Sequence, residues 1–135
     1  MGEAMFGWGK RRAAQKFLAA DVGRTLLAVM SLPAEVQRHI ASQVSEALEA
    51  ATTDLKARYS EDIYADHLRK VTAKRHVALA AGATDYRDPT WAAAALTEAW
   101  LMAFSPKFNR KFYVQINGAV VGWTTSVLGA RDRRS

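Results

Sequence analysis

Residues 111–123, KFYVQINGAVVGW, decide the fold class, because they can form either a β-hairpin or a helix. As a hairpin, the segment turns at Asn117 and Gly118, a dipeptide that favours the type I′ turn because both central positions need a positive φ. The register of such a hairpin pairs Phe112 with Trp123 on one face, which could be buried against other elements.

The helical alternative places the same large side chains on one stripe, but it has two glycines in the helix interior. Each interior glycine costs about 1 kcal/mol relative to alanine. A lone hairpin, in turn, is only marginally stable unless it packs against another surface. We therefore expect a mainly α protein, a bundle of about four helices with a C-terminal β-hairpin. The alternative is an all-α five-helix bundle.

The rest of the chain repeats apolar residues at three- and four-residue spacing, which is typical of amphipathic helices. Ser60 and Asp88 are expected N-caps, Pro33 suits the first turn of a helix, and Gly82 is expected to end one. The expected helices span residues 10–31, 33–58, 60–81 and 89–104, and the expected strands span residues 111–116 and 119–125.

Two of these helices have a well-defined apolar face. In the second, Ile40, Val44, Leu48 and Leu55 fall on one side, so we expect them to be buried. The first helix is expected to bury a stripe made of Phe17, Leu18, Val22, Leu26, Leu27 and Met30.

The length and composition are those of one globular domain. The chain has 135 residues, half of them hydrophobic and 24% charged, and it has no cysteine, which excludes disulfides and thiolate chemistry. We expect a single helical domain over residues 1–135 with mobile ends near residues 1–9 and 130–135. We read no secretory signal and no transmembrane segment, because the uncharged stretch 112–130 is too polar, and cytoplasm is the default location.

Residues with catalytic or metal-binding chemistry are few. Glu35 and His39 share a helical face, and Asp62, Asp66 and His67 form a second small group. No nucleotide-binding motif occurs, and the pairs of Glu-x-x-His segments of a di-iron bundle are missing. We therefore expect no metal, no cofactor and no catalytic residues, and an enzyme is the least favoured function.

The net charge of +6 indicates attraction to acidic partners. The basic residues are clustered, and aromatic side chains lie between the clusters, as in some proteins that bind nucleic acid or anionic membranes. The candidate contacts for such ligands are Lys10, Arg11, Arg12, Lys74, Lys107, Arg110 and Lys111.

The final third of the chain is unusually aromatic, and tryptophan and tyrosine are favoured anchors at protein interfaces. The leading hypothesis is therefore a non-enzymatic small helical module that binds another protein or itself, and the expected partner is a second copy in a homo-oligomer or another protein. Weak, non-specific binding to nucleic acid or an anionic membrane surface is the alternative. The interface candidates are Trp91, Trp100, Phe108, Tyr113 and Trp123.

Overall fold

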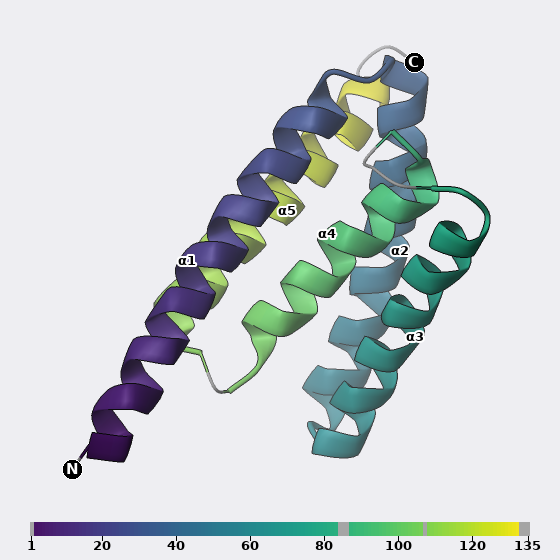
Figure 1. The fold of residues 1–135 in the computed structure, drawn as a ribbon. Coiled ribbons are helices and arrows are strands. Elements are labelled where there is room, and N and C mark those ends of the chain that lie inside the picture. Colours follow the sequence, from purple (N-terminus) through teal and green to yellow (C-terminus); the bar gives the residue numbers. More distant parts are fainter. Residues whose placement is uncertain (1, 84–86, 107, 133–135) are drawn as a thin grey trace.

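The computed structural model describes residues 2–83, 87–106 and 108–132, with side chains described from Gly9 to Gly129 within these ranges. In this part of the chain the regular structure consists of five α-helices (Figure 1). They are α1 (Gly2–Met30), α2 (Ala34–Ala57), α3 (Glu61–Ala80), α4 (Pro89–Phe104) and α5 (Arg110–Asp132).

The expected C-terminal hairpin is wrong: Asn117 and Gly118 lie inside the continuous helix α5. The stripe of Phe112, Ile116 and Val120 is buried, together with Trp123. Burying one large apolar side chain contributes about 1.5–3 kcal/mol, whereas each interior glycine costs about 1 kcal/mol. Burial of this stripe therefore outweighs the poor helix propensity of the segment, and the five-helix alternative fits.

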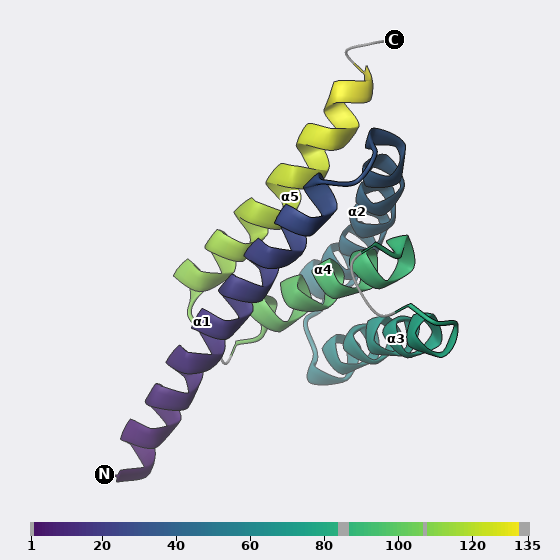
Figure 2. The same cartoon turned by 45° about the horizontal axis from the view of Figure 1, so that its top comes forward.

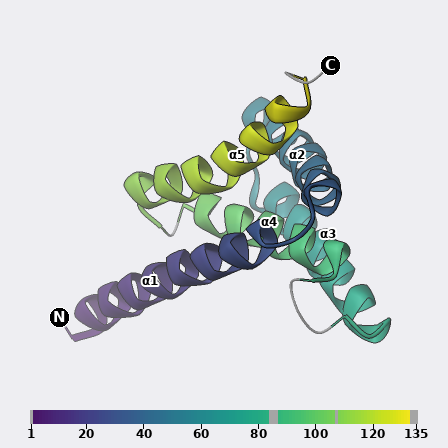
Figure 3. The ribbon, with the colours of Figure 1, turned by 90° about the horizontal axis from the view of Figure 1, so that it is seen from above.

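Helix α4 lies at the centre of the bundle and packs against all four other helices (Figures 1 and 3). Its four successive alanines, residues 92–95, are buried, as are Leu96, Trp100 and Leu101. Small side chains let neighbouring helices approach α4 closely from several sides. Helices α1 and α5 run in the same direction, and α4 runs in the opposite direction beside them (Figure 1).

The helix ends confirm the capping residues read from the sequence. The backbone N–H of Ile63 donates to Ser60 Oγ at 3.0 Å, and the N–H of Trp91 donates to Asp88 Oδ1 at 3.0 Å. Gly82 follows α3 with φ +100, a conformation that glycine adopts easily. The expected bounds agree within one residue for α2 and α3 and coincide for α4.

Two further caps were not foreseen. Asn109 Oδ1 accepts a hydrogen bond of 2.7 Å from the backbone N–H of Phe112, which caps the start of α5. At the α1–α2 turn, the side-chain amide of Gln37 donates to the carbonyls of Met30 (3.0 Å) and Leu32 (2.8 Å). These bonds satisfy carbonyl groups that the end of α1 leaves without helical partners.

Helix α1 is longer than expected, since it begins at Gly2 rather than near residue 10. Its N-terminal turns extend past the rest of the bundle (Figure 2). No helix in the described part of the chain combines the length and the apolar character needed to cross a membrane.

Candidate functional site

Four of the five aromatic interface candidates, Trp100, Trp123, Phe108 and Tyr113, lie in or against the core rather than in an exposed patch. Trp100 is 2% exposed and Trp123 is 9% exposed, so each would have to leave the core to contact a partner. Phe108 and Tyr113 are half-buried and pack on the core. Trp91 is half-buried beneath Arg75, whose guanidinium carbon lies 4.5 Å from the centre of a Trp91 ring.

These aromatic residues mostly contact each other. The rings of Trp100, Phe104 and Tyr113 form a triad with centroid distances of 5.4 to 5.8 Å, and Phe108 packs edge-on against Phe112 at 5.4 Å. Burial raises the pKa of the Tyr113 hydroxyl above its usual value. The aromatic character of the final third of the sequence is thus largely accounted for by internal packing.

The basic candidates fall on separate helices. Lys10, Arg11 and Arg12 are exposed on α1, Arg110 and Lys111 are exposed at the start of α5, and Lys74 is exposed on α3, while Lys107 lies outside the described residues. The N-terminal half of α1 and the start of α5 lie toward one end of the bundle, whereas α3 lies on the other side (Figure 3). Lys74 is therefore separated from the other described basic candidates, which lie on α1 and α5.

An exposed apolar face runs along the outside of α1, and the sequence reading did not foresee it. Phe17 is 69% exposed, Leu27 72% and Met30 57%. The face that packs into the bundle consists instead of Leu18, Val22, Thr25 and Val29. The expected burial of Phe17, Leu27 and Met30 is wrong, because α1 has apolar residues on both sides and only one side meets the bundle; Lys16 and Arg24 lie among the apolar residues of the outer side.

His39 of α2, His67 of α3 and the carboxylate of Asp66 each contact a polar or charged side chain nearby. His67 Nε2 lies 2.7 Å from Asp54 Oδ2, and Asp66 pairs with Arg69 and with Lys70. The hydrogen bonds from Lys70 and Arg69 lower the pKa of Asp66 below its usual value. His39 Nε2 is 2.9 Å from Gln43 Nε2. Within the described residues, no three metal-ligating side chains gather at one point.

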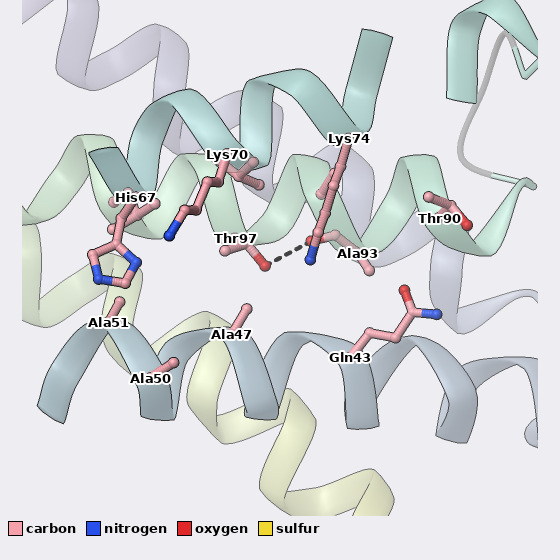
Figure 4. Close-up of a pocket in the computed structure, with 13 residues that line it drawn as sticks. Gln43, Ala47, Ala50, Ala51, His67, Lys70, Lys74, Thr90, Ala93 and Thr97 are labelled. Carbon is pink, nitrogen blue, oxygen red and sulfur yellow. Dashed lines mark hydrogen bonds between the residues drawn. The ribbon is translucent and has the colours of Figure 1, made fainter. Parts of the chain in front are cut away.

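A groove of about 230 Å³ lies between α2, α3 and α4 (Figure 4). Alanines from α2 and α4 line it, and His67, Lys70 and Lys74 extend toward it from α3. Of the residues proposed from the sequence for anion binding, Lys74 is the one in this groove. Sequence spacing did not reveal the groove, because its walls come from three separate helices.

No protein-family model, no curated protein and no solved structure matches this chain at a significant level.

Proposed function

We propose that the chain is a self-association module and that the outward face of α1 is its interface. The observation that carries this proposal is the exposure of Phe17, Leu27 and Met30 on the side of α1 that faces away from the bundle. We define the α1 face as these three residues together with Ala13, Ala20 and Gly23, which are also exposed.

An apolar surface of this kind is costly in water. Surface helices of globular proteins usually have a polar outer side, whereas on the outer side of α1 large apolar side chains stand beside Lys16 and Arg24. Contiguous exposed apolar patches typically mark interaction sites. The α1 face extends from Ala13 to Met30, which is about 26 Å at 1.5 Å per residue. A helix of similar length is therefore the partner of matching shape.

A second copy of α1 supplies such a helix if the two copies pack antiparallel. With the crossing point between Gly23 and Arg24, Phe17 lies beside Met30 of the second copy, and Leu27 lies beside Ala20 of the second copy. Large side chains then oppose either a flexible methionine or a small alanine. The same register places Arg24 of each copy beside Gly23 of the other copy, with the Arg24 guanidinium 3.7 Å from Asp21 of its own helix. The arrangement has two-fold symmetry, which is the commonest form of homo-oligomer.

Charge also favours the antiparallel arrangement. Parallel packing would place Lys10, Arg11 and Arg12 of both copies next to each other. Antiparallel packing instead brings these residues toward the C-terminal end of the other α1, where the helix dipole is negative, and toward Glu35 in the first turn of α2. The two-helix contact is smaller than a standard interface of about 800 Å² per partner, so we expect a dissociation constant in about the micromolar range.

Sedimentation velocity over a wide concentration range, at low and high salt, tests the proposal. We expect a reversible dimer that persists at high salt, because apolar burial is not screened. Leu27→Lys should abolish the dimer without unfolding the chain, since Leu27 is exposed. Val114→Lys is the matched control, because Val114 is also exposed (55%) but lies on α5.

Titrations with two further kinds of ligand, nucleic acid and anionic vesicles, distinguish self-association from binding to nucleic acid or a membrane surface. Labelled DNA and RNA, and vesicles containing phosphatidylserine, are titrated with the same protein. Electrostatic attachment to these ligands should weaken steeply with salt. The self-association proposal would be contradicted by a chain that stays monomeric at all concentrations. It would also be contradicted by tight binding of nucleic acid or vesicles at physiological salt, if Leu27→Lys has no effect on assembly.

A further inference from the structure

The groove between α2, α3 and α4 exists because the three helices meet there through small side chains. Helix α3 packs mainly against α4 and only lightly against α2, so α2 and α3 leave a gap above α4. Ala47, Ala50 and Ala51 line the gap from α2, and Ala93 and Ala94 line it from α4. The Thr97 hydroxyl is already used, because it donates to the carbonyl of Ala93 at 2.8 Å. The floor of the groove is therefore largely apolar.

The rim of the groove is positively charged. The ammonium groups of Lys70 and Lys74 both point from α3 toward the groove (Figure 4). Lys70 pairs with Asp66 at 3.0 Å, a carboxylate that it shares with Arg69, and His67 Nε2 lies in hydrogen-bond contact with Asp54 Oδ2 at 2.7 Å. Lys74 forms no ion pair or hydrogen bond with the described part of the chain. Lys74 is thus the ammonium of the rim that has no carboxylate partner among the described residues.

We propose that this groove binds a small organic monoanion, an apolar body carrying one carboxylate. The carboxylate would pair with the Lys74 ammonium, and the apolar body would cover the alanine floor. One ammonium without a carboxylate partner matches one negative charge, and the carboxylates of Asp54 and Asp66 nearby repel a ligand of higher negative charge. The volume of about 230 Å³ lies below the range typical of drug-sized ligands, which limits the ligand to about one ring or a short chain.

This inference does not depend on the proposed self-association. The groove is formed by α2, α3 and α4, whereas the proposed interface is on α1. Because an exposed lysine contributes modestly and the contact area is small, we expect millimolar affinity for a simple probe.

The test is a titration of the ¹⁵N-labelled chain followed by amide chemical shifts, with benzoate as the probe. Benzyl alcohol controls for the apolar body without charge, and inorganic phosphate controls for charge without an apolar body. We expect benzoate to shift amides around Ala50, Lys74 and Ala93 with saturation, and to bind more tightly than either control. Repeating the titration with Leu27→Lys, which removes the proposed α1 interface, should give the same affinity.

Two variants test the assigned contacts. Lys74→Gln should weaken benzoate binding about fivefold. This loss of affinity is larger than expected for a typical exposed ion pair and smaller than expected for a hydrogen bond to a charged group. Lys74→Arg keeps the positive charge and should largely retain binding. Ala50→Leu should fill the groove and block binding. Lys111→Gln and Ala73→Leu are the matched controls, since both residues are exposed and lie outside the groove.

Any of the following results would overturn the inference. The first is equal binding of benzyl alcohol and benzoate, because Lys74 would then contribute nothing. The second is equal binding of phosphate and benzoate, because the alanine floor would then contribute nothing. The third is a set of amide chemical-shift changes centred on other basic residues, such as Lys10. The fourth is unchanged affinity for benzoate in Lys74→Gln.

Discussion

The indole Nε1 of Trp100 donates a hydrogen bond of 2.8 Å to Oδ1 of Asn117, and this bond connects the central helix α4 to α5. Trp100 is almost completely buried, so its N–H needs a protein partner there. Asn117 has poor helix propensity and favours turns, yet it stands in the middle of a helix. Its side chain contributes to stability through the bond to Trp100, which compensates for that poor propensity.

Asn117→Ala should destabilise the chain by a net of about 1 kcal/mol. Leaving the buried indole N–H without a partner costs about 1–3 kcal/mol, and the better helix propensity of alanine offsets part of that loss. Urea unfolding measures the change. Gln115→Ala, at an exposed position on the same helix, is the control and should change stability by less than about 0.5 kcal/mol.

Gly118→Ala should stabilise the chain by about 0.5–1 kcal/mol, because Gly118 is helical and a Cβ there meets no atom within 4 Å. A hairpin would show the opposite result, since its turn needs a positive φ at this position. Gly82→Ala is the contrast: with φ +100, it should cost about 1–2 kcal/mol. Thermal unfolding of both variants is the measurement, and a destabilised Gly118→Ala would argue against a continuous α5.

Leu48→Ala should lower the free energy of unfolding by about 2–5 kcal/mol, because Leu48 is buried in the main core cluster. Glu49→Ala next to it is exposed and should have an effect within about 0.5 kcal/mol. Denaturant titration of the two variants compares them directly. A loss below about 1 kcal/mol for Leu48→Ala would mean that this face of α2 is not central to the core.

The stability of the chain should fall at alkaline pH because of Tyr64. Burial raises the pKa of its hydroxyl to about 12, and the hydroxyl donates to the carbonyl of Leu101 at 2.6 Å. In the unfolded chain Tyr64 ionises near its ordinary value of about 10. Its contribution is therefore complete below about pH 10 and is lost as the pH rises toward about 12.

Urea unfolding at a series of pH values from neutral to alkaline checks this expectation. Tyr64→Phe should flatten the alkaline slope and lower stability at neutral pH by about 1 kcal/mol, through loss of the hydroxyl–carbonyl bond. Tyr59→Phe is the control, because Tyr59 is exposed and should change the slope less. An unchanged alkaline slope in Tyr64→Phe would show that other groups cause it.

The sequence by itself determined most of the helical framework. Ser60, Asp88 and Gly82 act on backbone groups within a few residues, so their effect on helix ends can be read from neighbouring positions alone. The burial of Ile40, Val44 and Leu48 also followed from helical periodicity. These features are local, and local spacing is sufficient to predict them.

The tertiary structure decided the conformation of residues 111–123 and the orientation of α1. Asn117-Gly118 favours a turn locally, but the bond to Trp100 and the burial of Phe112 and Ile116 depend on residues in other helices. In α1 both sides carry large apolar residues, and which of them are buried depends on where α4 and α5 lie. The groove beside Lys74 likewise needs three helices. The spacing of residues in the sequence does not predict these three features, because they are set by packing between segments that are far apart in the chain.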